Sequence, residues 1–184
     1  MTETYNPGLI DFDVQYIGQS IGNDGTRNFL DRVKNHEKLQ QIYVDNENNE
    51  SKIGILAFKV SKDQTLISII PPSGAASSNI LEDGFNLMEN LTIEEIVTLF
   101  EASFIKYFRP KYNKYFKDNF PSSNMKCLRS LYGKDFFGIS AEISFRDFPF
   151  NLYSDFKVKE SSNIYAAYFD LNSEDEKRRF FNIL

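Results

Sequence analysis

Residues 92–113 read TIEEIVTLFEASFIKYFRPKYN and contain the clearest helix signals of this chain. Thr92 and Glu95 form the pattern of a capping box, in which each side chain satisfies a backbone N–H at the start of a helix. Pro110 ends the helix, because proline has no N–H to donate and its ring clashes with the preceding turn. The stretch predicts a helix from Thr92 to about Phe108, with an inward apolar stripe of Ile93, Val97, Phe100, Phe104 and Phe108.

Glu101 places a charged side chain beside the apolar stripe of this helix, because it falls between the directions of Ile105 and Phe108. A carboxylate close to a buried face needs a partner, since burying an unpaired charge commonly costs several kcal/mol. Glu101 can therefore pair with a cation, bind a metal ion, or do both in different states.

The chain before this helix carries a similar anomaly. The pattern predicts a helix from about Thr26 to Tyr43 whose apolar side includes Arg32 and His36, four residues apart and therefore adjacent. An Arg32–Glu101 ion pair is the simplest explanation, but it leaves His36 unexplained. His36 is the single histidine of the chain, and a lone histidine on an apolar face more often has a structural than a catalytic role. The predicted stripe is Phe29, Arg32, Val33, His36, Leu39 and Tyr43.

Short apolar runs with β-branched residues predict the strands. The predicted fold class is α/β (α+β), a small, mainly antiparallel sheet flanked by helices. Residues 1–119 are predicted to form one domain and residues 120–184 a C-terminal β/α extension packed on it. The predicted strands are Val14–Gly18, which ends in a glycine turn, Ile53–Val60 and Thr65–Ile70, joined by a hairpin at 61–64, the alternating run Ile139–Phe145, and Ile164–Leu171; a capped helix follows from Ser173.

The amino-acid composition indicates the class of protein and its cellular compartment. Apolar residues make up 41% of the chain, enough for a packed core, and no run approaches the 18 apolar residues of a membrane span. Cys127 is the single cysteine, so no internal disulfide is expected, and the start of the chain lacks the pattern of a signal peptide. These features predict a protein of the reducing cytoplasm.

The charge is unevenly distributed. A net charge of -5 argues against a general nucleic-acid binder, because contacts to phosphates need Lys and Arg. Between Ala102 and Asn119, however, basic residues outnumber acidic ones. Either a solvated helix face or a phosphate-binding surface explains this segment, which contains Lys106, Arg109, Lys111, Lys114, Lys117 and the single acid Asp118.

Four features occur in a fixed order: Tyr16-Ile17-Gly18, R-x-x-x-H from Arg32 to His36, the helical Glu101, and Pro110-Lys111-Tyr112-Asn113. Together they resemble the GIY-YIG nuclease superfamily, which includes homing endonucleases, some restriction enzymes and the incision subunit of bacterial excision repair. The similarity runs from Tyr5 to Asn113. Tyr5 stands eleven residues before Tyr16, where the family has the tyrosine of its GIY motif, although Glu3-Thr4 precedes it here.

The resemblance implies a role for each matching residue. Glu101 would hold one Mg²⁺ or Mn²⁺, a hard cation that prefers oxygen ligands. Tyr16 would orient or deprotonate the attacking water, Arg32 would stabilise charge on the phosphorus, and His36 would donate to a phosphate oxygen or relay protons. Asn113 would brace the site through its side-chain amide.

Further residues are candidates for the site or for contacts to nucleic acid. Tyr5 would complete the catalytic set, and Gly18 would allow close approach of the backbone after the strand. Tyr112 and Tyr115 are each compatible with base stacking or with a structural role. Candidate phosphate contacts are Arg27, Lys106, Arg109 and Lys111.

The predicted function is a metal-dependent endonuclease that hydrolyses phosphodiester bonds, of DNA rather than RNA, in restriction, repair or anti-phage defence. The alternatives are a GIY-YIG-like module that has lost catalysis and recognises nucleic acid or protein, and an unrelated α/β protein. The expected partner is nucleic acid and not a membrane, and a homo-oligomer or a larger defence or repair complex is compatible with this function.

Overall fold

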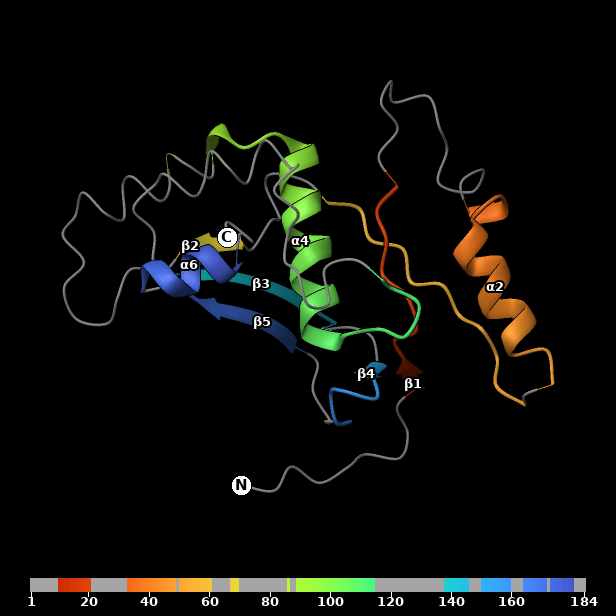
Figure 1. Ribbon diagram of the computed structural model, residues 1–184. Helices are drawn as coiled ribbons and strands as arrows, with labels where there is room; N and C mark the ends of the chain where they lie inside the picture. Colours follow the sequence, from red (N-terminus) through yellow and green to blue (C-terminus); the bar gives the residue numbers. More distant parts are fainter. Residues whose placement is uncertain are drawn as a thin grey trace.

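The chain folds as a mixed α/β protein with two small sheets and one central helix (Figure 1). The computed structural model describes residues 10–20, 33–48, 50–60, 67–69, 86, 89–114, 138–145, 150–159, 164–171 and 173–180. The elements are β1 (Ile10–Asp13), α2 (Glu37–Asp45), β2 (Ile67–Ile69), α4 (Ile93–Phe108), β3 (Gly138–Ser144), β4 (Phe150–Tyr153), β5 (Ile164–Asp170) and α6 (Glu174–Phe180).

The larger sheet is antiparallel, with strand order β2-β3-β5. Ile139 and Ala141 of β3 are buried while Ser144 is exposed, so the predicted alternation is confirmed. The second sheet is a parallel pair of β1 and β4, aligned from Ile10 opposite Phe150 to Asp13 opposite Tyr153. The predicted class, with a small, mainly antiparallel sheet, is therefore confirmed.

The helix α4 is the centre of the described core. The capping box at Thr92 is formed, since Thr92 Oγ1 accepts from Glu95 N and Glu95 Oε2 accepts from Thr92 N. Residues around most of its circumference are buried. The predicted stripe is only partly correct, because Ile93 is 39% exposed. The core cluster against the sheets contains Phe104, Phe108, Ala141, Phe145, Leu152, Tyr165 and Ala167.

Strands from the N-terminal half of the chain pair with strands from the C-terminal half. β1 pairs with β4, and β2 pairs with β3, so the C-terminal strands complete both sheets. The boundary at 119/120 lies outside the described residues, and the division of the chain there stays a prediction. No helix within the described ranges is long and apolar enough to cross a membrane.

Two strand predictions are wrong. Residues 51–60 form no strand. A β-rich run becomes a strand only where a neighbour accepts its hydrogen bonds, and β1 pairs with β4 instead. The strand predicted at Val14–Gly18 lies earlier, at Ile10–Asp13, and Val14 N donates the last bond of that ladder to Tyr153 O at 2.8 Å. The hairpin residues 61–64 lie outside the described ranges.

The long helix predicted from Thr26 to Tyr43 is only partly correct in its described part, because it is interrupted before α2. Residues 33–34 are helical, but His36 has extended dihedral angles (φ -84, ψ 107) and is the N-cap of α2. The apolar face differs too, because Tyr43 is 51% exposed and Ile42 is the buried residue of α2. The argument that placed Arg32 beside His36 on one continuous helix therefore fails; Arg32 itself lies outside the described residues.

Candidate active site

The turn after α4 holds the segment that carries Tyr16. Arg109 ends the helix in the left-handed conformation (φ 50), and Pro110 and the next residues reverse the chain. Tyr112 N donates to Gln15 O at 3.0 Å. A turn more than ninety positions downstream therefore fixes residues 15–17.

Asn113 makes the strongest link between the two segments. Ile17 N donates to Asn113 Oδ1 at 2.9 Å, and Asn113 Nδ2 donates to Ile17 O at 2.8 Å. Asn113 is only 6% exposed. Because both backbone groups of Ile17 are satisfied by one side chain, this segment needs no strand partner at that residue. The geometry is that of a brace, the role that the resemblance implies for Asn113.

Tyr16 and His36 meet, although twenty residues separate them. The Tyr16 hydroxyl lies 3.4 Å from His36 Nε2, and the rings pack edge to face with centroids 5.1 Å apart. Both residues are half-buried. The separation is at the long end for a hydrogen bond. A phenol and an imidazole in contact can pass a proton between them.

Gly18 makes room for the Tyr16 ring. A Cβ at Gly18 would lie 2.7 Å from Tyr16 Cε1 and 2.8 Å from the Tyr16 hydroxyl oxygen. Such distances essentially never occur, so the ring has its place beside His36 only because residue 18 has no side chain. The close approach expected at Gly18 is therefore made by the ring of Tyr16.

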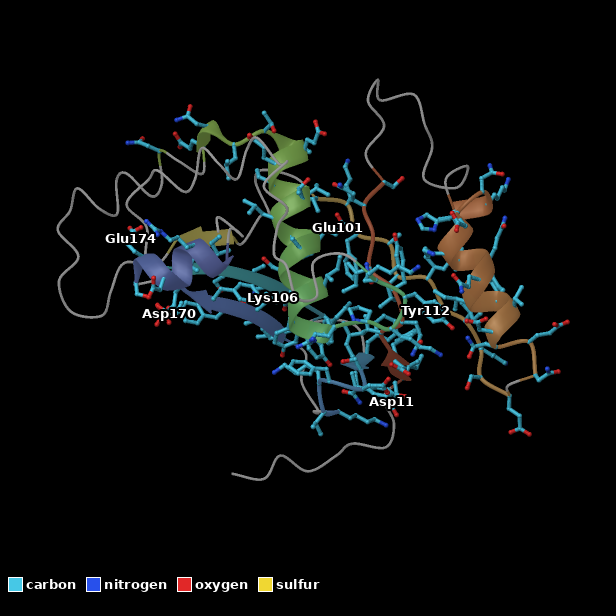
Figure 2. The ribbon with its side chains drawn as sticks, in the orientation of Figure 1. Asp11, Glu101, Lys106, Tyr112, Asp170 and Glu174 are labelled. Atoms are coloured by element: carbon cyan, nitrogen blue, oxygen red, sulfur yellow. The ribbon has the colours of Figure 1, made fainter. Side chains whose placement is uncertain are left out.

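Glu101 lies half-buried in the middle of α4 (Figure 2). Thr98, one turn earlier on the same helix face, donates its hydroxyl to Gln19 Oε1 at 3.4 Å. The face that Thr98 and Glu101 share is thus directed at the segment that carries Tyr16.

The sequence-predicted residues fall into three groups. The structure brings Tyr16, His36 and Asn113 together, because His36 contacts Tyr16 and Asn113 bonds to the adjacent Ile17. Glu101 lies half-buried on α4, three positions after Thr98, whose hydroxyl donates to Gln19. The residues Tyr5, Arg27 and Arg32 lie outside the described ranges, and their roles stay predictions.

The predicted phosphate contacts do not form one surface around Tyr16. Lys106 Nζ lies 5.7 Å from the ring centroid of Phe169 in β5, and Arg109 lies 5.0 Å from that of Phe156. Lys111 lies beside the Tyr112 ring at 5.2 Å. In Figure 2, Lys106 and Tyr112 lie on opposite sides of α4. Lys111 is thus close to the turn that holds Tyr16, and Lys106 is not.

A metal site would depend on few protein ligands. Within the described ranges, no three His, Cys, Asp or Glu side chains gather closely enough to hold a metal ion. A site for Mg²⁺ or Mn²⁺ would therefore use one or two carboxylates, with water and substrate oxygens filling the rest of the coordination shell, as is common for Mg²⁺ in phosphoryl-transfer sites. Glu101 is the carboxylate to which the resemblance gives this role.

The sequence did not reveal the contact between Tyr112 and α2. The Tyr112 hydroxyl donates to Asp45 Oδ2 at 2.7 Å, and Tyr112 is 8% exposed. The hydrogen bond to Asp45, together with burial, raises the pKa of Tyr112 above its usual value. This burial favours the structural role of Tyr112 over base stacking. No local signal links Tyr112 to Asp45, because 67 positions separate them.

Comparisons with models of protein families, with curated proteins and with solved structures find no match to this chain. Its function therefore has to be argued from its own residues.

Proposed function

We propose that this chain is a divalent-metal-dependent endonuclease of the GIY-YIG type that hydrolyses phosphodiester bonds of nucleic acid, DNA in preference to RNA. The observation that carries the proposal is the contact between the Tyr16 hydroxyl and His36 Nε2 at 3.4 Å, in a segment braced by Asn113. Neither residue is needed at that point for the apolar core, whose cluster lies between α4 and the sheets.

Tyr16 acts on the attacking water in this proposal. A free phenol has a pKa near 10, so at neutral pH its oxygen is a better orienting group than a base unless its proton is shared. The imidazole of His36 lies where it can take that proton. Tyr16 then holds the water in line with the phosphorus while His36 stores or returns the proton.

Glu101, at a half-buried position on α4, would hold the metal ion. A divalent ion held there would supply polarisation of the scissile phosphate and stabilisation of the leaving oxygen. Arg32 would neutralise the charge that develops on the phosphate. The biological setting proposed is restriction, repair or anti-phage defence.

A nuclease-like recognition module without catalysis is the second candidate. The net charge of -5 favours it, because a general phosphate-binding enzyme gains from a positive surface. The position of Lys106 beside the Phe169 ring, on the other side of α4 from Tyr112, favours it as well.

Cleavage and binding measured on the same samples separate the two functions. Purified protein is incubated with supercoiled plasmid, single-stranded DNA and single-stranded RNA, in Mg²⁺, in Mn²⁺ and in EDTA. The nuclease proposal predicts metal-dependent nicking that EDTA abolishes, and a loss of at least about 100-fold in rate for Tyr16→Phe. Tyr43→Phe, an exposed tyrosine on α2, is the matched control and should cut like the parent.

Two results count against a nuclease. Binding of nucleic acid without cutting in either metal would support the recognition module. Absence of both cutting and binding would refute the nuclease and a module that recognises nucleic acid, and would leave recognition of a protein as the remaining candidate.

A further inference from the structure

Tyr112 touches both elements that bring Tyr16 and His36 together. Its backbone N–H donates to Gln15 O at 3.0 Å, next to Tyr16 in the chain. Its hydroxyl donates to Asp45 Oδ2 at 2.7 Å, on the last residue of α2. His36 caps the other end of the same helix. One residue thus connects the segment of Tyr16 to the helix of His36.

The helix α2 needs such a connection. It has nine residues, of which only Ile42 is buried, and a helix this short is not stable in isolation. In Figure 1, α2 lies away from β3 and β5, on the far side of residues 50–60. Within the part of the chain that the structure describes, few contacts therefore determine where α2 lies.

The charge of Asp45 makes the contact specific. A carboxylate at the C-terminal end of a helix opposes the helix dipole, and α2 has no basic residue in its last turn. The buried hydroxyl of Tyr112 compensates that carboxylate by donating a hydrogen bond to it. Asp45 and Tyr112 consequently depend on each other for their positions.

We propose that Tyr112 is a positioning residue that sets the distance between Tyr16 and His36, and its effect on catalysis rests on the proposed nuclease function. The helix α2 moves as a short rigid rod, so a shift at Asp45 is transmitted to His36 at the opposite end. The Tyr16–His36 contact is already 3.4 Å long, so a displacement of less than about 1 Å breaks it.

The single histidine makes this proposal directly measurable. The imidazole Cε1–H of His36 gives one proton resonance, which needs no assignment by mutation of other histidines. Tyr16→Phe removes the hydroxyl beside the His36 ring. The chemical shift of the His36 proton in this variant shows the size and direction of the change when the contact is lost. Tyr112→Phe should displace the signal in the same direction, with the amide spectrum otherwise that of a folded protein.

Three further variants sharpen the test. Tyr43→Phe removes an exposed hydroxyl from the same helix and should leave the His36 signal as in the parent. Asp45→Asn keeps an acceptor oxygen for Tyr112 and should retain the parental signal, whereas Asp45→Ala should reproduce the change caused by Tyr112→Phe. Since Asp45 is exposed, Asp45→Ala also serves if Tyr112→Phe does not fold.

The outcome for cleavage is separate. If the parent cuts DNA, Tyr112→Phe should lower kcat about 10-fold to 100-fold with KM near the parental value. A displaced His36 signal in a protein that never cuts would support the positioning role and refute the nuclease. A parental His36 signal in Tyr112→Phe, or in Asp45→Ala if that variant replaces it, would refute the positioning role, whatever the cleavage result.

Discussion

The side-chain amide of Asn113 binds both backbone groups of Ile17, accepting from its N–H at 2.9 Å and donating to its carbonyl at 2.8 Å. The two bonds replace, for Ile17, the hydrogen bonds that a strand partner would supply. Tyr16, which immediately precedes Ile17, can therefore stand clear of the sheets and still be held in place.

Asn113→Ala should destabilise the protein. The substitution removes two hydrogen bonds and leaves a partly buried N–H and carbonyl of Ile17 unsatisfied, which costs about 1–3 kcal/mol for each buried group. We expect the free energy of unfolding to fall by about 2–4 kcal/mol in urea denaturation. Asn48→Ala, at an exposed position, should change it by less than about 0.5 kcal/mol. Equal stability of the two variants would contradict the brace.

Gly18→Ala should impair cleavage more than it impairs folding. The new Cβ would lie 2.7 Å from Tyr16 Cε1, so the Tyr16 ring must leave its place beside His36. Gly54→Ala is a matched control, because its Cβ would lie 2.6 Å from Phe12 Cε1 and would displace a ring that packs against Phe150. We expect a loss of at least about tenfold in cleavage rate for Gly18→Ala alone. Comparable losses in both variants would mean that the effect is general.

Asp13→Asn should stabilise the protein at neutral pH. Partial loss of hydration around the carboxylate, together with the nearby Asp155, raises the pKa of Asp13 above its ordinary value of 3.8. The folded state therefore holds this proton more tightly than the unfolded state, and the stability that this contributes below pH 3.8 is lost as the pH rises through the folded pKa.

The effect is measured as the difference in unfolding free energy between Asp13→Asn and the parent. Because Asp13 is exposed, solvent screening should keep the gain at pH 7 below about 1 kcal/mol. The difference should shrink towards zero below pH 3.8. A variant less stable than the parent at pH 7 would show that ionised Asp13 makes a favourable contact.

Tyr112→Phe should also change the response to alkali. The hydrogen bond to Asp45 raises the pKa of Tyr112, so its contribution to stability is complete below about pH 10 and is lost as the pH rises through the folded pKa. At pH 8 the parent should be more stable than the variant by about 1.5 kcal/mol, the low end for a bond to a charged group, because Asp45 is exposed. This difference in unfolding free energy should decline above pH 10. A difference that stays constant to pH 12 would show that the hydrogen bond to Asp45 does not raise the pKa of Tyr112.

Elements with local signals were predictable from the sequence. Helix α4 is specified by the capping box at Thr92 and by Pro110, and α6 by a second box in which Glu176 N donates to Ser173 Oγ. β3 and β5 show runs of β-forming residues. The pairing of β1 with β4 was not predictable, because choice of a strand partner depends on residues 140 positions away.

The candidate site also contains residues that the sequence predicted and contacts that it did not. The order of motifs pointed to Tyr16, His36 and Asn113, and the structure brings these three together. The break in the helix at His36 was missed, because Arg32, Val33 and Leu39 continue a helical pattern across it. The bond between Tyr112 and Asp45 was missed because it follows from tertiary placement alone.

The proposed nuclease function requires that Glu101 and the Tyr16–His36 pair form one metal-dependent hydrolytic site. The most direct test compares Glu101→Gln with Glu94→Gln, an exposed glutamate in the first turn of the same helix. Both variants are assayed on plasmid DNA across a titration of Mg²⁺ and Mn²⁺. We expect Glu94→Gln to cut DNA like the parent and Glu101→Gln to lose roughly 1,000-fold in cleavage rate. A Glu101→Gln variant that cuts like the parent would rule out this site.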